Sequence, residues 1–172
     1  MGLEVAASAR RLGVEVTVIE AADRPMPGRV PEYVSRHFQR LHEEHGVAFR
    51  FGRTVGEFKQ DGGRFAGVVL DDGSEIGADI AIVAIGSVPN TEWLEGSGLD
   101  ISNGVVCDPR NRAAENIFAI GDVASVFHPE VGRNLRIEHR LTANAHAETV
   151  AAVLTGMEPP IQATPYFWSD QF

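Results

Sequence analysis

The first fifty residues alternate between helical and extended patterns of apolar side chains. Residues 2–12 carry apolar side chains at helical spacing, and the Gly13 that follows is suited to end a helix. Residues 14–19 are rich in β-branched side chains, which is typical of a buried parallel strand. A second helix is predicted over 32–44 and a second strand over 47–52. The alternation predicts an α/β fold with a Rossmann-like parallel sheet.

The hydrophobic pattern changes at Val55. From there to residue 79 it is typical of short antiparallel strands joined by Asp-Gly turns at 61–62 and 72–73. A very apolar stretch over 80–85 then predicts a further strand. We therefore expect an antiparallel β-meander inserted into the α/β fold.

The second half of the chain contains one short apolar stretch with a polar end. Residues 117–120 predict a buried strand, and Gly121 and Asp122 follow it directly. Open α/β sheets bind ligands at the carboxyl edge of their strands, so Asp122 is a candidate ligand-binding carboxylate. A helix is predicted over about 138–154.

Composition and charge exclude several classes of function. The chain has 172 residues and a net charge of −9, which argues against nucleic acid as a partner because phosphate binding needs a clustered basic surface. It contains no stretch of 18 apolar residues, so no membrane span is predicted, and its N-terminus lacks the order of a signal peptide. A lone cysteine, Cys107, allows no internal disulfide and no CxxC dithiol. We expect a reduced, cytoplasmic protein without a metal site, in which His139 and His146 are ordinary helix-surface residues.

The first helix begins where a dinucleotide-binding motif would end. Such a motif has a strand, a glycine-rich turn and then a helix whose N-terminus holds the pyrophosphate, and Gly2 could be the last of its glycines. Glu20 lies 18 residues later, at the end of the next predicted strand. An acid in that position accepts hydrogen bonds from the adenosine ribose and repels a 2′-phosphate. The alternative is a solvated carboxylate at a strand end.

Five segments of the chain, in order, resemble one family of flavoproteins. These segments are GLEVAASARRLGVEVTVIEAADRP, DDGSEIGADIAIVAIGSVPNTEWL, IFAIGDVAS, RIEHRLTANAHAETVAAVLTG and PYFWSDQF. Together they resemble the ferredoxin and rubredoxin (putidaredoxin-type) reductases of the FAD- and NAD-dependent pyridine nucleotide-disulfide oxidoreductase superfamily, and the match covers essentially the whole chain. The resemblance implies an incomplete two-dinucleotide-binding-domain flavoprotein fold.

The resemblance also implies a domain organisation and a reaction. Residues 1–87 would be an NAD-binding domain lacking its first strand, 88–157 the C-terminal part of an FAD-binding domain, and 158–172 the start of an interface domain. A full-length relative would transfer hydride from NADH to FAD, and then single electrons to a ferredoxin- or rubredoxin-type carrier. NADH would be preferred over NADPH because of Glu20. The alternatives are a fragment of an NADH oxidase, of a nitrite-reductase flavin module, or of a redox protein similar to apoptosis-inducing factor.

The implied truncation has consequences of its own. A fragment without the first FAD-binding unit is expected to bind FAD weakly or not at all and to be inactive alone. Unpaired sheet edges could also allow it to self-associate.

Site roles follow from the same resemblance, residue by residue. The candidate catalytic residues are Glu4, near the nicotinamide and flavin, and Trp168, which would lie close to both rings. The candidate cofactor-binding residues are Gly2, Glu20, Arg29, Gly86, Gly121, Asp122 and Arg140. Each has an ordinary structural alternative, such as a solvated arginine for Arg29 and a helix N-cap for Asp122.

The predicted helix over 138–154 differs from its counterparts in two places. Relatives often have an aromatic or apolar residue where this chain has Arg140, and commonly a glutamine in place of His146. Arg140 could tune the flavin by its charge or obstruct its usual position. With Arg133 and Arg136 it also forms a basic cluster that could steer an acidic electron carrier, the alternative being solvated arginines.

Overall fold

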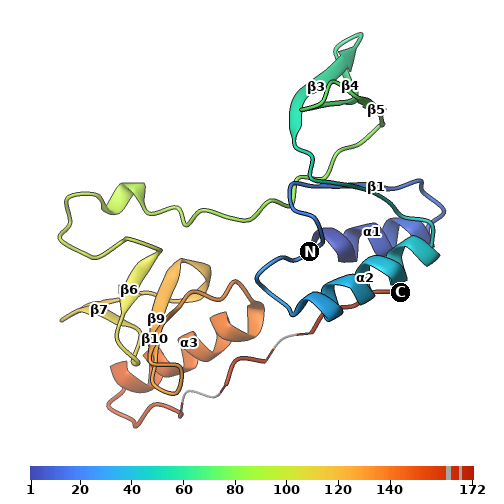
Figure 1. Cartoon of the computed structure of the whole chain (residues 1–172). Helices are drawn as coiled ribbons and strands as arrows, with labels where there is room; N and C mark the ends of the chain where they lie inside the picture. Colours follow the sequence, from blue (N-terminus) through green and yellow to red (C-terminus); the bar gives the residue numbers. More distant parts are fainter. Residues whose placement is uncertain (162–163, 167) are drawn as a thin grey trace. The chain divides into compact units, whose positions relative to one another are not determined.

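The computed structural model describes residues 1–161, 164–166 and 168–172, and its chain forms two compact units. The first unit comprises residues 1–85 together with 169–172, and the second comprises residues 86–168 (Figure 1). Each unit is described by itself. No helix within the described residues is long and apolar enough to cross a membrane.

The first unit begins with an α/β arrangement. Its elements are α1 (Gly2–Arg11), β1 (Thr17–Glu20), α2 (Glu32–Glu44) and β2 (Ala48–Phe51). Strands β1 and β2 pair in parallel, with Thr17 opposite Ala48 and Glu20 opposite Phe51. The predicted α/β alternation is confirmed, although β1 is shorter than the predicted strand.

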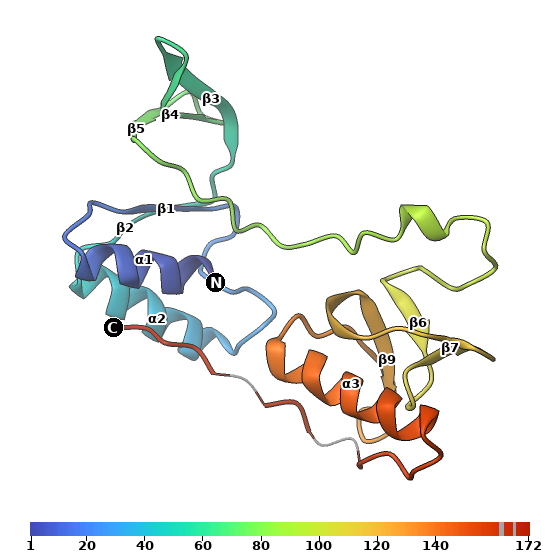
Figure 2. The same ribbon diagram turned by 180° about the vertical axis from the view of Figure 1, so that it is seen from behind.

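Helices α1 and α2 lie side by side in both views of the ribbon (Figures 1 and 2). Helix α1 buries Leu3, Ala6 and Ala7, and the small side chains of the two alanines allow close packing. From α2, the fully buried His42 places its Nε2 atom 3.0 Å from the carbonyl oxygen of Leu3 and its Nδ1 atom 2.8 Å from that of Phe38. This imidazole links the two helices through their backbones.

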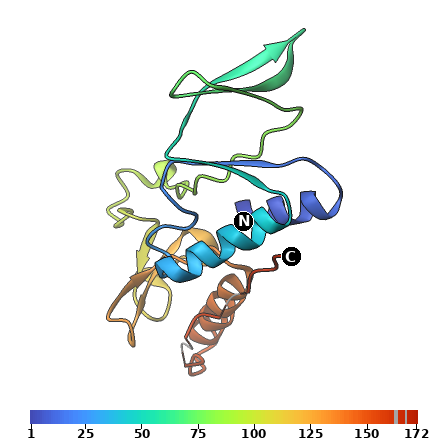
Figure 3. The ribbon, with the colours of Figure 1, turned by 45° about the vertical axis from the view of Figure 1, so that its right-hand side comes forward.

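The antiparallel insert is confirmed. Strands β3 (Val55–Asp61), β4 (Arg64–Leu70) and β5 (Glu75–Gly77) form one sheet in that order, which extends away from the helices of the first unit (Figure 3). The turn between β4 and β5 is stabilised by Asp72, which accepts hydrogen bonds from the hydroxyl and the backbone N–H of Ser74. These bonds, with Arg53, lower the pKa of Asp72 to about 2.

The strand expected over residues 80–85 does not form. The segment belongs to no sheet, and the apolar residues Ile80, Ile82, Val83 and Ile85 are between 63% and 92% exposed. A strand needs a neighbour to satisfy its backbone N–H and C=O groups. Among the described residues of the first unit, the parallel sheet consists of β1 and β2 alone.

The second unit is a small β structure followed by one helix. Its elements are η1 (Glu92–Leu94), β6 (Val105–Cys107), β7 (Arg112–Ala114), β8 (Ile117–Phe118), the 3-10 turn η2 (Gly121–Val123), β9 (Ala124–His128), β10 (Arg133–Leu135) and α3 (Arg140–Leu154). In its three-stranded sheet, β9 pairs in parallel with β6 and antiparallel with β10. Figure 2 shows α3 beside this sheet.

The prediction of a buried parallel strand over 117–120 is wrong. Only β8 forms there, and it pairs antiparallel with β7. Ile117 and Ile120 are each 46% exposed, while Ala119 is buried. The parallel pairing begins later, at Ala124, because the core accommodates β9 rather than β8 against β6.

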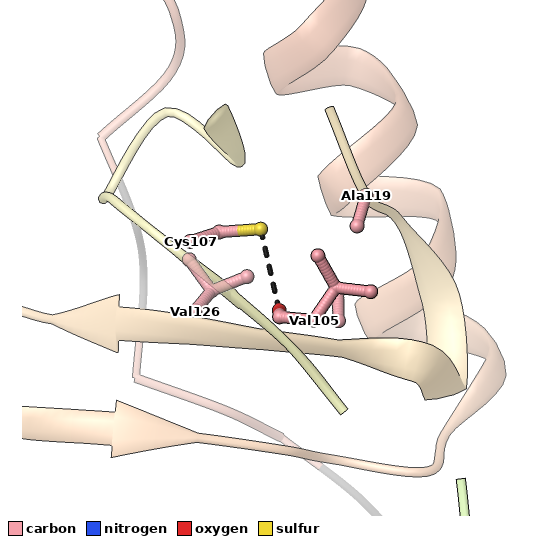
Figure 4. Packing of buried hydrophobic residues seen from close by; sticks show 5 residues of the cluster. Val105, Cys107, Ala119 and Val126 are labelled. Atoms are coloured by element: carbon pink, nitrogen blue, oxygen red, sulfur yellow. Dashed lines mark hydrogen bonds between the residues drawn. The ribbon is translucent and has the colours of Figure 1, made fainter. Parts of the chain in front are cut away.

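The core of the second unit gathers residues from both sides of η2. Val105 and Cys107 come from β6, Ala119 precedes η2, and Ala124 and Val126 follow it in β9 (Figure 4). The Cys107 thiol donates a hydrogen bond of 3.4 Å to the carbonyl oxygen of Val105, and burial raises the pKa of the thiol. Turn η2 is therefore anchored at both ends by buried side chains.

Gly104 lies against η2 so closely that no side chain fits. Its φ is +78°, and a Cβ atom there would lie 2.3 Å from the carbonyl oxygen of Val123. Gly98 has a similar φ of +82°, but a Cβ atom there would meet nothing within 4 Å. The two glycines thus separate the cost of backbone conformation from the cost of crowding.

We predict that Gly104→Ala destabilises the second unit much more than Gly98→Ala. The left-handed conformation costs about 1–2 kcal/mol in either variant, and crowding at residue 104 adds about 1–3 kcal/mol. Urea unfolding followed by tryptophan fluorescence measures this, since Trp93 and Trp168 both belong to the second unit. Equal losses in the two variants would contradict the assigned close approach.

Candidate functional site

The turn that carries Asp122 is positioned by a backbone clamp just before it. The side chain of Asn111, which is 1% exposed, donates from Nδ2 to the main-chain carbonyl oxygen of Ala119 at 2.9 Å. The main-chain carbonyl oxygen of Asn111 accepts the Ala119 N–H at 3.1 Å. Gly121 follows with a φ of +71° and would place a Cβ atom 3.8 Å from that of Ala143 in α3. The chain turns sharply here, and Asp122 is left exposed.

Three residues lie at the N-terminus of α3: His139, Arg140 and, through contact with His139, Trp168. The helix begins at Arg140, two residues after the predicted start, and His139 is its N-cap. The Nδ1 atom of His139 accepts the Leu141 N–H at 3.2 Å, which satisfies one of the free N–H groups of the first turn. The His139 ring also meets the Trp168 ring edge to face, with centroids 5.0 Å apart. Arg140 is exposed.

A cavity of about 320 Å³ lies beside Asp122 in the second unit. It is lined by Ser87, Val88, Pro89, Asn90, Asp122, Val123, Arg136 and Glu138. Gly86 precedes this lining segment and has a φ of +109°. The cavity brings the exposed carboxylate together with hydroxyl, amide and guanidinium groups, a donor set that suits a polyhydroxyl chain. The size of the cavity suits part of a dinucleotide cofactor.

The candidates at the N-terminal helix lie in the first unit. Gly2 is the first residue of α1, and a Cβ atom on it would lie 3.4 Å from that of Ala84. Glu4 is ion-paired with the N-terminal ammonium group at 2.9 Å and accepts a 2.9 Å hydrogen bond from Ser169. The ammonium group first, and Ser169 second, hold the pKa of Glu4 below its usual value. Glu4 is therefore an ionised acceptor at neutral pH.

Glu20 and Arg29 also lie in the first unit, but only Glu20 belongs to a strand. Glu20 is the last residue of β1, and its Oε1 atom accepts the Ala22 N–H at 3.0 Å. Arg29 is an exposed residue in a turn between Pro27 and Pro31. The carboxylate of Glu20 is thus fixed at the carboxyl end of a parallel strand, as the ribose-binding hypothesis requires.

The candidates fall into two groups. Gly86, Gly121, Asp122, Arg140 and Trp168 belong to the second unit, while Gly2, Glu4, Glu20 and Arg29 belong to the first. Within the second unit, α3 packs against η2, with Gly121 beside Ala143 of the helix. Their binding roles stay predictions.

The structure corrects two expectations about charged side chains. The Arg136 side chain is only 14% exposed and is ion-paired with Glu138, so it does not form an exposed basic cluster with Arg133 and Arg140. His146 is 6% exposed rather than on the helix surface, and its Nδ1 atom has no hydrogen-bond partner. Burial lowers the pKa of His146. Among the described residues, no group of three or more His, Cys, Asp or Glu side chains could hold a metal ion.

Comparison with known proteins identifies the family to which the chain belongs. Residues 1–149 match the family described as pyridine nucleotide-disulphide oxidoreductase. The chain belongs to this family. The Gly121-Asp122 turn and the α/β start of the chain both lie within the matched residues.

The relatives include several electron-transfer reductases. The chain is 42% identical to rhodocoxin reductase of Rhodococcus erythropolis and 40% identical to the ferredoxin–NAD(+) reductase component of the anthranilate 1,2-dioxygenase system of Burkholderia cepacia. Both alignments cover 100% of this chain, but only 40% and 42% of the relatives. This family member thus spans about two fifths of the length of these relatives.

Solved structures agree with the sequence relatives. The ferredoxin reductase for the CYP199A2 system of Rhodopseudomonas palustris matches with a TM-score of 0.90 at 37% identity. The covalent complex of putidaredoxin reductase with putidaredoxin matches with a TM-score of 0.93 at 35% identity. Each match covers 99% of this chain and 42% of the solved chain. The two-dinucleotide flavoprotein fold, in part, is confirmed.

Several residues around the site were missed by reasoning from sequence. Ser87, Asn103, Asn111 and Glu138 are ordinary polar residues in segments without periodicity, so no local pattern distinguishes them. The positive φ of Asn111, +60°, is a conformation that asparagine tolerates better than most residues. An Asn between Asp-Pro-Arg and a short strand was the one available signal of a tight turn.

We predict that His146 makes the second unit acid-sensitive. Its pKa in the folded chain lies below that of an unfolded histidine, about 6.5, so the unfolded state binds the proton more readily. Stability is therefore present above about pH 6.5 and falls as the pH drops towards the folded pKa. The measurement is the difference in urea midpoint between pH 7 and pH 5, by tryptophan fluorescence.

His146→Gln is expected to reduce this difference, because the amide does not titrate. His37→Gln, at an exposed position in the first unit, is the control and should leave the difference unchanged. An identical pH dependence in wild type and His146→Gln would show that burial of His146 is not the cause.

Proposed function

We propose that this chain forms part of an FAD-dependent NADH:ferredoxin or NADH:rubredoxin oxidoreductase. The observation that carries the proposal is the position of Asp122, an exposed carboxylate at the wall of a cavity, on a turn that packs against α3. A carboxylate there can accept hydrogen bonds from the hydroxyl groups of a ribityl chain. When bound, FAD supplies the exchange between two-electron and one-electron chemistry.

The residues of the chain would bind and orient the two cofactors. Asp122 would hold the ribityl portion of FAD, while the first turn of α3, with Arg140, would present positive charge to the flavin ring. Glu20 would accept the ribose hydroxyls of NADH, and Gly2 would allow close approach of its pyrophosphate. In the first unit, Glu4 would lie near the nicotinamide, and Arg29 would meet the phosphate or ribose of the cofactor. In the second unit, Gly86 would let the backbone approach the nicotinamide end, and Trp168 would lie close to the cofactor rings.

A carrier of the ferredoxin or rubredoxin type is supported by the relatives. Rhodocoxin reductase and rubredoxin–NAD(+) reductases are among them, and putidaredoxin reductase has been solved joined to putidaredoxin. Of the three arginines considered for docking, Arg133 and Arg140 are exposed. These two would steer an acidic carrier, while Arg136 is engaged internally.

The proposal can be tested in the context of a relative. In a chimera, the stretch of rhodocoxin reductase that aligns with this chain is replaced by the chain itself. We expect FAD binding and NADH-dependent reduction of a ferredoxin-type carrier. Asp122→Asn should weaken FAD binding about 10- to 100-fold, since it removes a charged acceptor.

The same chimera tests the cofactor preference. Glu20→Ala should lower the preference for NADH over NADPH about tenfold or more, because repulsion of the 2′-phosphate is lost. Glu15→Ala, an exposed acid before β1, is the control. A folded chimera without flavin would overturn the assignment of Asp122.

We also predict that the 172-residue chain alone purifies without stoichiometric flavin and does not couple NADH oxidation to a carrier. Its cavity of about 320 Å³ has room for only part of FAD. The apolar residues 80–85 and the edges of the β1–β2 sheet lack backbone partners, so we further expect self-association. Flavin absorbance, carrier-reduction assays and sedimentation velocity measure these outcomes, and a yellow, active monomer would contradict them.

A further inference from the structure

Arg136 bridges three segments around the Asp122 turn. Its Nε atom donates to the Oδ1 atom of Asn103 at 3.0 Å, and its Nη1 atom donates to the Asp122 carbonyl oxygen at 3.4 Å. The same Nη1 atom is ion-paired and hydrogen-bonded with Glu138. With a side chain only 14% exposed, Arg136 is a largely buried connection between η2, the turn at residue 103 and the approach to α3.

Glu138 extends this connection to a fourth segment. Its Oε1 atom, which accepts from Arg136, also accepts a hydrogen bond from the hydroxyl of Ser87. Ser87, Arg136 and Glu138 all line the cavity beside Asp122. Two walls of the cavity are therefore joined through one carboxylate oxygen.

The geometry requires a guanidinium group rather than a positive charge alone. A guanidinium group presents donors in fixed, divergent directions, and here two different nitrogens are used for acceptors on different segments. A lysine ammonium group is a single point on a flexible stem, so it cannot reproduce the same set of directions. The side chain also runs over Gly104, where a Cβ atom would come within 3.0 Å of the Arg136 Cδ atom.

Gly104 and Arg136 hold η2 at successive residues. The backbone at residue 104 lies against the Val123 carbonyl, and Arg136 binds the Asp122 carbonyl. Together they restrict the two peptide groups on either side of Val123, the first of which begins at Asp122, and thus the direction in which the Asp122 side chain leaves the turn.

We propose that Arg136 is a positioning residue, which with Glu138 and Ser87 fixes the Asp122 turn and the cavity wall so that the Asp122 carboxylate meets its ligand. The inference rests on the proposed function, because the ligand is taken to be the ribityl portion of FAD. Arg136 itself acts through Asp122 and is not assigned a contact with the cofactor.

The experiment uses the full 172-residue chain and four variants. Arg136→Lys keeps the positive charge but loses the divergent N–H donors of the guanidinium group. Arg133→Lys, at the exposed neighbouring arginine, is its control. Glu138→Ala removes the shared acceptor, whereas Glu138→Gln keeps an oxygen that can accept from both Arg136 and Ser87. Tryptophan fluorescence verifies that the second unit is folded in each variant.

The readout is amide NMR at residues 121–124. The Ala124 N–H donates to the Gly121 carbonyl oxygen and so reports on closure of the turn. We expect Arg136→Lys and Glu138→Ala to shift these amides and to raise hydrogen exchange at Ala124 about tenfold. Glu138→Gln should restore the wild-type exchange rate to within about threefold, and Arg133→Lys should change nothing. Unchanged amides in folded Arg136→Lys would overturn the proposal.

A second arm, the affinity of the rhodocoxin reductase chimera for FAD, separates the inference from the proposed function. A loss of affinity in both Asp122→Asn and Arg136→Lys supports the positioning role. If Arg136→Lys disturbs the turn but the folded chimera binds no FAD, the role of Arg136 in holding the turn is supported and the flavin assignment of Asp122 is overturned. If the chimera binds FAD equally well with and without Arg136→Lys, the positioning role is overturned.

Discussion

The second unit depends on the close approach of the backbone at residue 104 to turn η2. The 2.3 Å separation between a hypothetical Cβ atom and the Val123 carbonyl leaves room for hydrogen only. This approach lets β6 and β9 pair directly after the turn, with Val105 opposite Ala124. The core of Val105, Cys107, Ala119, Ala124 and Val126 then closes around the turn. A larger residue at position 104 would separate the strands that fix the ends of η2.

The polar groups near the turn are organised by the same constraint. Asn111 fixes the backbone before Gly121 through two hydrogen bonds with Ala119, and Arg136 binds the turn itself. Each of these side chains donates one hydrogen bond to a backbone carbonyl in or just before η2, which is in place only once the turn has its observed path. The exposed carboxylate of Asp122 therefore stands on a turn whose backbone is held from several directions, which suits a ligand-binding role.

The α/β start and the antiparallel insert could be predicted from sequence, because they depend on local signals. Helix α2 occupies the predicted residues 32–44, where apolar spacing and flanking prolines and glycine agree. Strand formation over 80–85 and 117–120 could not be predicted in the same way. An apolar stretch indicates that a segment prefers burial, but whether it pairs as a strand depends on whether a neighbouring strand is in place. Residues 80–85 lack one in the described chain, and β8 pairs with β7 instead of entering a parallel sheet.

The sequence by itself indicated the family, because five segments in order resemble its members, and it determined the residue types available to a cofactor site. It placed Asp122 directly after Gly121, and the structure shows that residue exposed at a cavity. Only the tertiary structure decided what the surrounding charges do. Arg136 and Arg133 are alike in sequence, yet one is buried in an ion pair with Glu138 and the other is exposed. His146 is likewise a buried residue whose pKa is lowered by burial, since burial and partners are properties of the packed chain and not of a local pattern.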